Sequence, residues 1–240
     1  MFKDKFLKGI LFTCIASIFW GLPQPLFFNE LNHVDTLEVV LHRGLWSFVL
    51  LFLILLSFTN LNEFYNLFKS FYKIFILTIT ACLIASNWAC FIYAVGQERV
   101  QDASMGYFIT PMISIILGNI FLKEKLPFYK ITAVLLMFFA IVYLFVSLNE
   151  FPILIILIGS SWAVYGLLRK HIMVNPSIGL LYETFIISFI SIPYLLFMFI
   201  NGESNFISIN LKTTIFLVLT GGVTIFPLFF FNLGLKYIQL

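Results

Sequence analysis

Long apolar stretches alternate with short polar segments along the chain, and the lengths of the apolar stretches predict its elements. A helix needs about 20 consecutive apolar residues to cross about 30 Å of hydrocarbon. Eight stretches are close to this length or exceed it, at about 9–28, 37–58, 74–95, 103–122, 131–148, 152–168, 178–200 and 213–235. We therefore expect an all-α membrane protein, a polytopic helix bundle of eight spans with no soluble domain between them.

Composition excludes the other broad classes of protein. Hydrophobic residues make up 61% of the 240 residues and charged residues only 10%, whereas soluble domains are roughly one quarter charged. The net charge of +3 comes from few, scattered charges, which argues against a nucleic-acid partner. The expected surroundings are a lipid bilayer, and whether the chain forms a homo-oligomer stays open.

The distribution of Lys and Arg predicts the direction of the spans, because cytoplasmic loops carry an excess of these residues. Along the alternating path, only Arg99 and Lys212 fall on one side, and Arg43 lies within a span. The remaining basic residues share the other side: Lys3, Lys5, Lys8, Lys69, Lys73, Lys123, Lys125, Lys130, Arg169, Lys170 and Lys236. Both termini are predicted to be cytoplasmic.

The two halves of the chain resemble each other. Trp20 corresponds to Trp162, residues 41–48 correspond to 182–189, and residues 93–101 correspond to 231–239, at an offset that drifts only from 142 to 138. The repeat unit holds five helices, an odd number, so the second copy must enter the membrane inverted. We assign residues 1–148 to the first repeat and 149–240 to the second.

The repeat also predicts more chain than is present. The first copy continues through two helices after residue 101, whereas one residue follows residue 239. By this count the second copy lacks its last two helices, about 45 residues. We expect an incomplete 5+5 inverted-repeat, ten-helix transporter fold.

Several motifs, in order and over nearly the whole chain, resemble the RarD-like branch of the EamA family, within the drug/metabolite transporter superfamily. They are Leu41–Ser47, Asn87–Trp88 with Phe91–Val95, Ala103–Pro111, Leu117–Leu126, Ser161–Lys170, Tyr182–Thr184 and Gly221–Leu228. The resemblance implies ten helices around a central substrate cavity and transport of small metabolites or drugs across the bacterial inner membrane. The absent ninth helix would help to wall that cavity.

Three ionisable residues within the spans are candidates for a functional role: Glu183, His42 and Arg43. An intramembrane carboxylate is costly unless it faces protein or water or takes up a proton, so Glu183 is a candidate for proton coupling. The alternative is a carboxylate bonded to polar groups of a neighbouring helix. One possibility is that Arg43 with His42 binds an anionic substrate group or closes an outer gate. The alternative is that Arg43 extends outward to meet Glu38 or Asp35. Arg43 and Glu183 should lie near opposite membrane faces.

Polar and aromatic residues within the spans are candidates for the walls of a substrate pathway. Asn87 should point inward, toward either helix packing or a cavity. The other candidates are Trp20, Gln24, Trp88, Tyr107, Trp162 and Tyr165. The Trp and Tyr residues among them could instead lie at a lipid interface.

Glycine and proline interrupt three spans, and such interruptions point to the moving parts of transporters. The hinge or kink candidates are Pro23, Pro25, Pro111, Gly221, Gly222 and Pro227. A static kink is the alternative for each.

The leading hypothesis for function is a secondary transporter (permease) that works by alternating access. An enzyme is disfavoured, because neither a nucleophile with a base nor a cluster of carboxylates is evident. No metal site and no cofactor are predicted, since the histidines and cysteines do not cluster. The alternative is a non-functional truncated remnant, or a half-bundle that needs another chain for completion.

Overall fold

The computed structural model describes residues 2–58, 62–124, 126–147, 152–208 and 210–237. All of the regular secondary structure in these ranges is helical. The helices are α1 (Phe2–Gly21), α2 (Pro23–Asn29), α3 (Thr36–Phe58), α4 (Asn62–Leu67), α5 (Phe71–Gly96), α6 (Val100–Leu122), α7 (Phe128–Ser147), α8 (Ile153–Ile172), α9 (Pro176–Ile200) and α10 (Leu211–Leu235).

Eight stretches of helix in the described residues are long and apolar enough to cross a membrane, which confirms the prediction of an all-α polytopic fold. Each overlaps one predicted span, with ends that differ by a few residues. Among the apolar spans the largest difference is at α8, which continues four residues past the predicted end at Leu168 to Ile172, and the helix α1 itself begins at Phe2, before the predicted start of its span. The first span is divided into α1 and α2 at Leu22, immediately before Pro23. The last part of the predicted repeat match, residues 238–239, lies outside the described residues.

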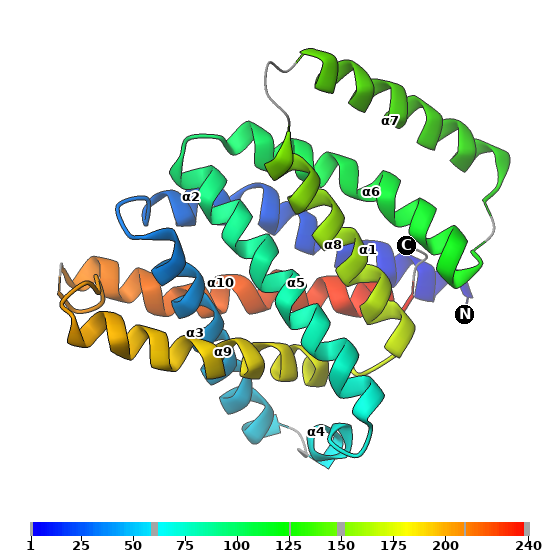
Figure 1. Ribbon diagram of the computed structural model, residues 1–240. Helices are drawn as coiled ribbons and strands as arrows, with labels where there is room; N and C mark the ends of the chain where they lie inside the picture. Colours follow the sequence, from blue (N-terminus) through cyan, green and yellow to red (C-terminus); the bar gives the residue numbers. More distant parts are fainter. Residues whose placement is uncertain (1, 59–61, 125, 148–151, 209, 238–240) are drawn as a thin grey trace.

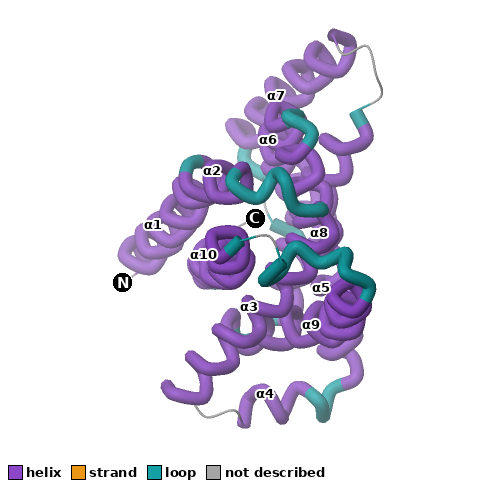
Figure 2. Tube along the Cα trace, turned by 90° about the vertical axis from the view of Figure 1, so that its left-hand side faces the viewer, coloured by secondary structure: helices purple, strands orange, loops and turns teal. Residues whose placement is uncertain are grey.

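Helix α10 occupies the middle of the bundle. It packs against α3, α1, α9 and α8, and Figure 2 shows it nearly end-on with the other helices around it. Helix α3 packs against α9, while α8 packs against both α5 and α6. The start of α1 and the end of α10 lie at the same end of the bundle (Figure 1).

Glycines allow the closest helix contacts. A Cβ added at Gly159 of α8 would lie 2.7 Å from the carbonyl oxygen of Gly106 on α6. A Cβ at Gly221 of α10 would lie 2.5 Å from the backbone carbonyl carbon of Trp46 on α3. Small residues at helix interfaces let backbones approach in this way, which is how membrane helices commonly gain packing energy.

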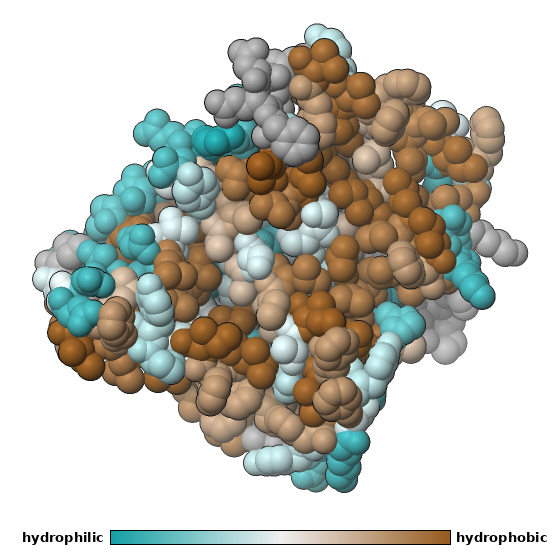
Figure 3. Space-filling view, viewed as in Figure 1, coloured by the Kyte–Doolittle hydropathy of each residue, from teal (hydrophilic) through white to brown (hydrophobic). Residues whose placement is uncertain are grey.

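The outer surface of the bundle is apolar, and α7 is its most exposed span. Only 6% of the apolar segment of α7 is buried against the rest of the bundle. This helix lies at the edge of the bundle, against α6 (Figure 1). Figure 3 shows hydrophobic side chains across the middle of one face, with hydrophilic side chains gathered at its two ends. This distribution fits a protein surrounded by lipid, with polar ends in the headgroup regions.

Candidate functional site

Glu183 lies at the centre of a polar network inside the bundle. Its side chain on α9 is 1% exposed. Thr80 on α5 donates a hydrogen bond to Oε1 at 2.6 Å, and the hydroxyl of Tyr165 on α8 donates to Oε2 at 3.2 Å. The Nε atom of Arg169 lies 3.5 Å from Oε1. Three helices therefore converge on one buried carboxylate, and the charge is compensated by an arginine.

The predicted sixth span ends at Leu168, which leaves Arg169 outside it, and the structure corrects that boundary. The helix α8 extends to Ile172, which brings Arg169 inside the bundle with 5% of its surface exposed. Its Nε donates to Asn232 Oδ1 at 3.2 Å, and Nη2 donates to the carbonyl oxygen of Pro176 at 3.1 Å. A Cβ at Gly179 would lie 1.6 Å from Nη1. The glycine therefore leaves the space that the guanidinium group fills.

Arg43 on α3 is buried without a carboxylate beside it among the described residues. It is 2% exposed, so it does not extend outward to Glu38 or Asp35, and that alternative is wrong. Its Nε donates to Thr224 Oγ1 of α10 at 2.7 Å. The guanidinium carbon lies 4.3 Å from the ring centroid of Trp88 and 4.9 Å from that of Phe28. Within the described part of the chain, Nη1 has no hydrogen-bond partner.

Asn87 points inward, as predicted, and makes contacts that hold helices together. Its Nδ2 donates to the carbonyl oxygen of Ile158 at 2.9 Å and to Ser161 Oγ at 3.0 Å, both on α8. Its Oδ1 accepts from the hydroxyl of Tyr107 on α6 at 3.2 Å. All polar atoms of the amide are thereby used, and α5, α6 and α8 are joined at one point.

The predicted aromatic residues lie in the interior of the bundle. The rings of Trp20 and Trp162 meet edge to face with centroids 5.0 Å apart, and Trp162 stacks on Tyr165 at 5.2 Å. Trp88 belongs to the same buried cluster, which Tyr107 contacts. Gln24 on α2 is 3% exposed, and its Oε1 has no partner in the described residues. The structure thus places Tyr165 against Glu183, and Trp162 and Trp20 follow it in a chain of ring contacts.

His42 faces away from this interior, although it adjoins Arg43. Its Nε2 lies 3.9 Å from Glu38 Oε1, and its Nδ1 accepts a hydrogen bond from Trp46 Nε1 at 3.1 Å. Its ring also contacts Phe206, with centroids 4.7 Å apart. His42 and Trp46 line a separate cavity of about 300 Å³ beneath the loop between α9 and α10.

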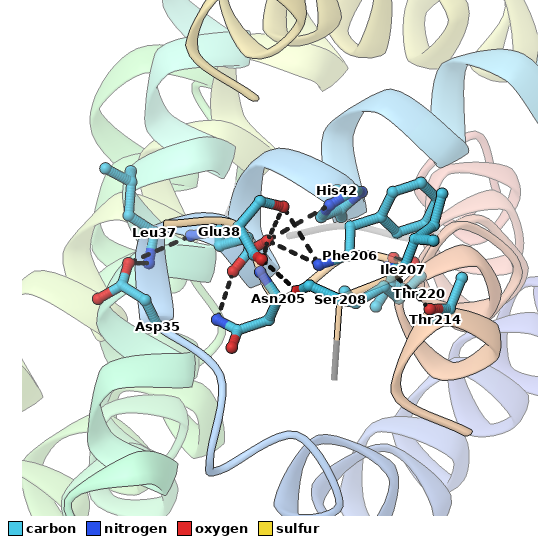
Figure 4. Close-up of polar contacts among 12 residues, drawn as sticks. Asp35, Leu37, Glu38, His42, Asn205, Phe206, Ile207, Ser208, Thr214 and Thr220 are labelled. Atoms are coloured by element: carbon cyan, nitrogen blue, oxygen red, sulfur yellow. Dashed lines mark hydrogen bonds and ion pairs between the residues drawn. The ribbon is translucent and has the colours of Figure 1, made fainter. Parts of the chain in front are cut away.

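Glu38 fastens that loop to α3, as Figure 4 shows. Its Oε1 accepts hydrogen bonds from Ser204 Oγ at 2.7 Å and from the backbone nitrogens of Asn205 and Phe206 at 2.8 and 3.3 Å. Its Oε2 accepts from Asn205 Nδ2 at 2.7 Å. The carboxylate is fully buried by the loop that it binds.

The hinge candidates differ in their surroundings. Among these candidates, a helix is interrupted only before Pro23, where α2 begins with the sequence Pro23-Gln24-Pro25. Helix α6 continues through Pro111, and α10 continues through Gly221, Gly222 and Pro227. Gly221 lies where the backbones of α10 and α3 approach closely, so helix packing explains why a glycine is needed at this position.

Sequence reasoning missed Arg169, Asn232, Thr80 and Thr224 as members of these networks. One signal for Arg169 was available: it lies four residues after Tyr165, and residues at this spacing share a helix face. The threonines gave no signal, because hydroxyl side chains are common in membrane helices, where they bond to their own backbone. Within the described residues, no group of three or more metal-ligating side chains is found.

The fold and these networks define a multi-pass membrane protein in which Arg43, Arg169 and Glu183 are buried between helices. Residues 7–146 match the EamA-like transporter family. The chain belongs to this family. No solved structure matches it.

Several bacterial proteins are similar over most of the chain. Protein RarD of Escherichia coli (strain K12) is 30% identical over 97% of this chain and 78% of its own length. Uncharacterized transporter YojE of Bacillus subtilis (strain 168) is 33% identical over 97% of this chain and 78% of its own length. An uncharacterized transporter of Vibrio cholerae is 33% identical over 94% of this chain and 74% of its own length. The resemblance to the RarD-like branch is thereby confirmed, and the chain is a membrane transporter by family.

Proposed function

We propose that this protein is a secondary transporter that moves a small metabolite or drug across the bacterial inner membrane by alternating access, with both termini in the cytoplasm. The observation that carries this proposal is the burial of Arg43 and Glu183 on the two neighbouring helices α3 and α9. Ionisable residues inside a membrane bundle mark substrate and ion pathways by default.

The two sites are arranged in a related way, which supports an inverted repeat of residues 1–148 and 149–240. In the proposed repeat, α3 corresponds to α9 and α5 corresponds to α10. Arg43 on α3 donates to a threonine of α10, and Glu183 on α9 accepts from a threonine of α5. The packing of α1 on α10 likewise corresponds to the packing of α8 on α5.

Arg43 is the residue we propose for binding an anionic group of the substrate. A buried guanidinium with an unfilled donor gains energy when a carboxylate or phosphate supplies the missing acceptor. The guanidinium also lies over the rings of Trp88 and Phe28, and such cation–π contacts stabilise its positive charge inside the bundle. Tyr107 and Trp162 line the same interior and would contact apolar parts of the substrate.

Glu183 is the residue we propose for proton coupling. It is the carboxylate that meets α5 and α8 at once, and its partners Thr80, Tyr165 and Arg169 provide both hydrogen-bond donors and a positive charge. Protonation would weaken its attraction to Arg169. A change in these contacts would therefore alter how three helices pack, which is how proton uptake can drive a conformational step.

Flux measurements on the purified full chain test the proposal. Proteoliposomes are loaded with a pH-sensitive dye, a proton gradient is imposed, and uptake is measured for a panel of amino acids, nucleosides and amphipathic drugs. We expect saturable, competable flux of at least one class. The absence of flux above protein-free liposomes for the whole panel, with the protein folded, would contradict the proposal.

A substitution at Glu183 tests the coupling residue separately. We expect Glu183→Gln to abolish the acceleration of flux by the proton gradient, because the amide cannot take up a proton, while substrate exchange without a gradient persists. Glu203→Gln is the matched control, since Glu203 is exposed in the α9–α10 loop. Equal dependence on the gradient in wild type and Glu183→Gln would rule out the coupling role.

A further inference from the structure

A basic cavity opens at the end of the bundle where α8 and α10 end and α9 begins, on the right of Figure 1. Its volume is about 360 Å³. The residues that decide its chemistry are Arg169, Lys170, Val174, Asn232, Leu235 and Lys236. It is distinct from the interior around Arg43 and from the cavity beneath the α9–α10 loop.

Three cations face this cavity, and no acidic side chain lines it in the described part of the chain. The carboxylates that pair with two of the cations lie outside the lining. Glu183 is 3.5 Å from Arg169 Nε, and Glu124 is 2.9 Å from Lys170 Nζ. Lys236 is exposed at the end of α10. The cavity wall is therefore positively charged, with its counter-charges behind it.

Arg169 lies in this wall, and one of its donors, Nη1, is buried against Gly179 without a partner among the described atoms. The residue is 5% exposed, and its Nη1 has no hydrogen-bond partner among the described atoms, although Nε and Nη2 are bonded. A buried donor without an acceptor is unfavourable, and the penalty is larger for a charged group. An anionic ligand in the cavity would lie beside this guanidinium group and offset the positive charge of the wall.

Helix ends alone do not explain this arrangement. Cations in the last turn of a helix stabilise its C-terminus, which accounts for the presence of basic residues at the end of α8. It does not account for the burial of Arg169, or for the convergence of cations from α8 and α10 on one cavity. The start of α9 at Pro176 also lines the cavity, and a helix N-terminus adds positive potential there.

We propose that the basic cavity binds the phosphate group of an anionic ligand. Arg169, Lys170 and Lys236 place three positive charges at the wall, and guanidinium and ammonium groups both bind phosphate. Val174 and Leu235 give the cavity an apolar wall beside the cations. A phosphate carried by a membrane lipid and a phosphate carried by a soluble ester share this chemistry, and the experiment separates the two sources.

The test is ligand binding to the purified full chain in a neutral detergent, counted by native mass spectrometry. The probes are short-chain phosphatidylglycerol, short-chain phosphatidylcholine and glycerol 3-phosphate. The variant is Lys170→Gln with Lys236→Gln, which leaves Arg169 and its contact with Glu183 in place. Lys73→Gln is the matched control, because Lys73 is an exposed lysine at the start of α5. Thermal unfolding of each variant confirms that it is folded.

We expect one anionic probe, phosphatidylglycerol or glycerol 3-phosphate, to bind the wild type and the control equally, and the double variant about tenfold or more weakly. Preference for phosphatidylglycerol over the other two probes would identify a lipid as the source. Binding of glycerol 3-phosphate would identify a soluble ester. The proposal is overturned if the double variant binds every probe as the wild type does, or if Lys73→Gln lowers binding equally.

Discussion

Glu38 and Glu203 show how differently two carboxylates near one loop are used. Glu203 is exposed at the start of the α9–α10 loop, whereas Glu38 is fully buried and accepts four hydrogen bonds from residues 204–206. Hydrogen bonds to a charged acceptor are stronger than those between neutral groups. The loop between α9 and α10 is therefore held to α3 mainly through one side chain.

We expect Glu38→Gln to lower the free energy of unfolding by about 1–3 kcal/mol, because the amide nitrogen replaces an acceptor oxygen and leaves a buried donor of the loop unpaired. Thermal unfolding in detergent, with protease cleavage of the loop as a second readout, measures the effect. Glu203→Gln should unfold like the wild type. If both variants are equally stable, Glu38 does not hold the loop.

The residues of the candidate site were only partly predictable from the sequence. Arg43 and Glu183 stand out because each is a charge within an apolar run. Arg169 does not stand out, because it follows the apolar run of α8 and is adjacent to Lys170. Tertiary contacts place Arg169 inside the bundle. Gly179 has no side chain and leaves space for the guanidinium group, and Asn232 supplies an acceptor. Neither can be read from hydropathy.

At the scale of the helices, the contact between α6 and α8 depends on two glycines. The carbonyl oxygen of Gly106 occupies the space next to Gly159, and Thr110 also approaches the carbonyl oxygen of Gly159 at 3.4 Å. A side chain at position 159 would meet backbone rather than a flexible side chain. The two helices would then have to separate.

We expect Gly159→Ala to destabilise the fold by about 1–3 kcal/mol, since overpacking against backbone forces the helices apart. Gly96→Ala is the matched control, because nothing lies within 4 Å of the Cβ position there, and alanine favours helix over glycine. The midpoints of thermal unfolding in detergent compare the two. Equal midpoints for the two variants would show that the α6–α8 contact tolerates separation.

The elements themselves were predicted better than their irregularities. Eight spans follow from apolar length alone, because lipid leaves a helix as the ordinary way to satisfy the backbone. The break at Leu22 was expected from Pro23 and Pro25. The short helix α4 and the extension of α8 were not predicted, since both contain or border polar residues, where hydropathy gives no signal.

At the scale of the whole molecule, the charges at the two ends of the bundle predict its direction in the membrane. Lys73 at the start of α5 lies on the side that holds most of the basic residues, and Glu203 lies on the other side. Both side chains are exposed, so each can report which compartment it faces. The excess of Lys and Arg assigns the side of Lys73 to the cytoplasm.

The prediction is tested by cysteine labelling in a variant in which Cys14, Cys82 and Cys90 are replaced by serine. A membrane-impermeant maleimide should label the Glu203→Cys variant in intact spheroplasts. It should label the Lys73→Cys variant only after lysis. The reverse pattern would invert the assignment. Labelling at both positions before lysis would contradict the path of eight crossings, because Lys73 and Glu203 are separated by an odd number of spans in that path.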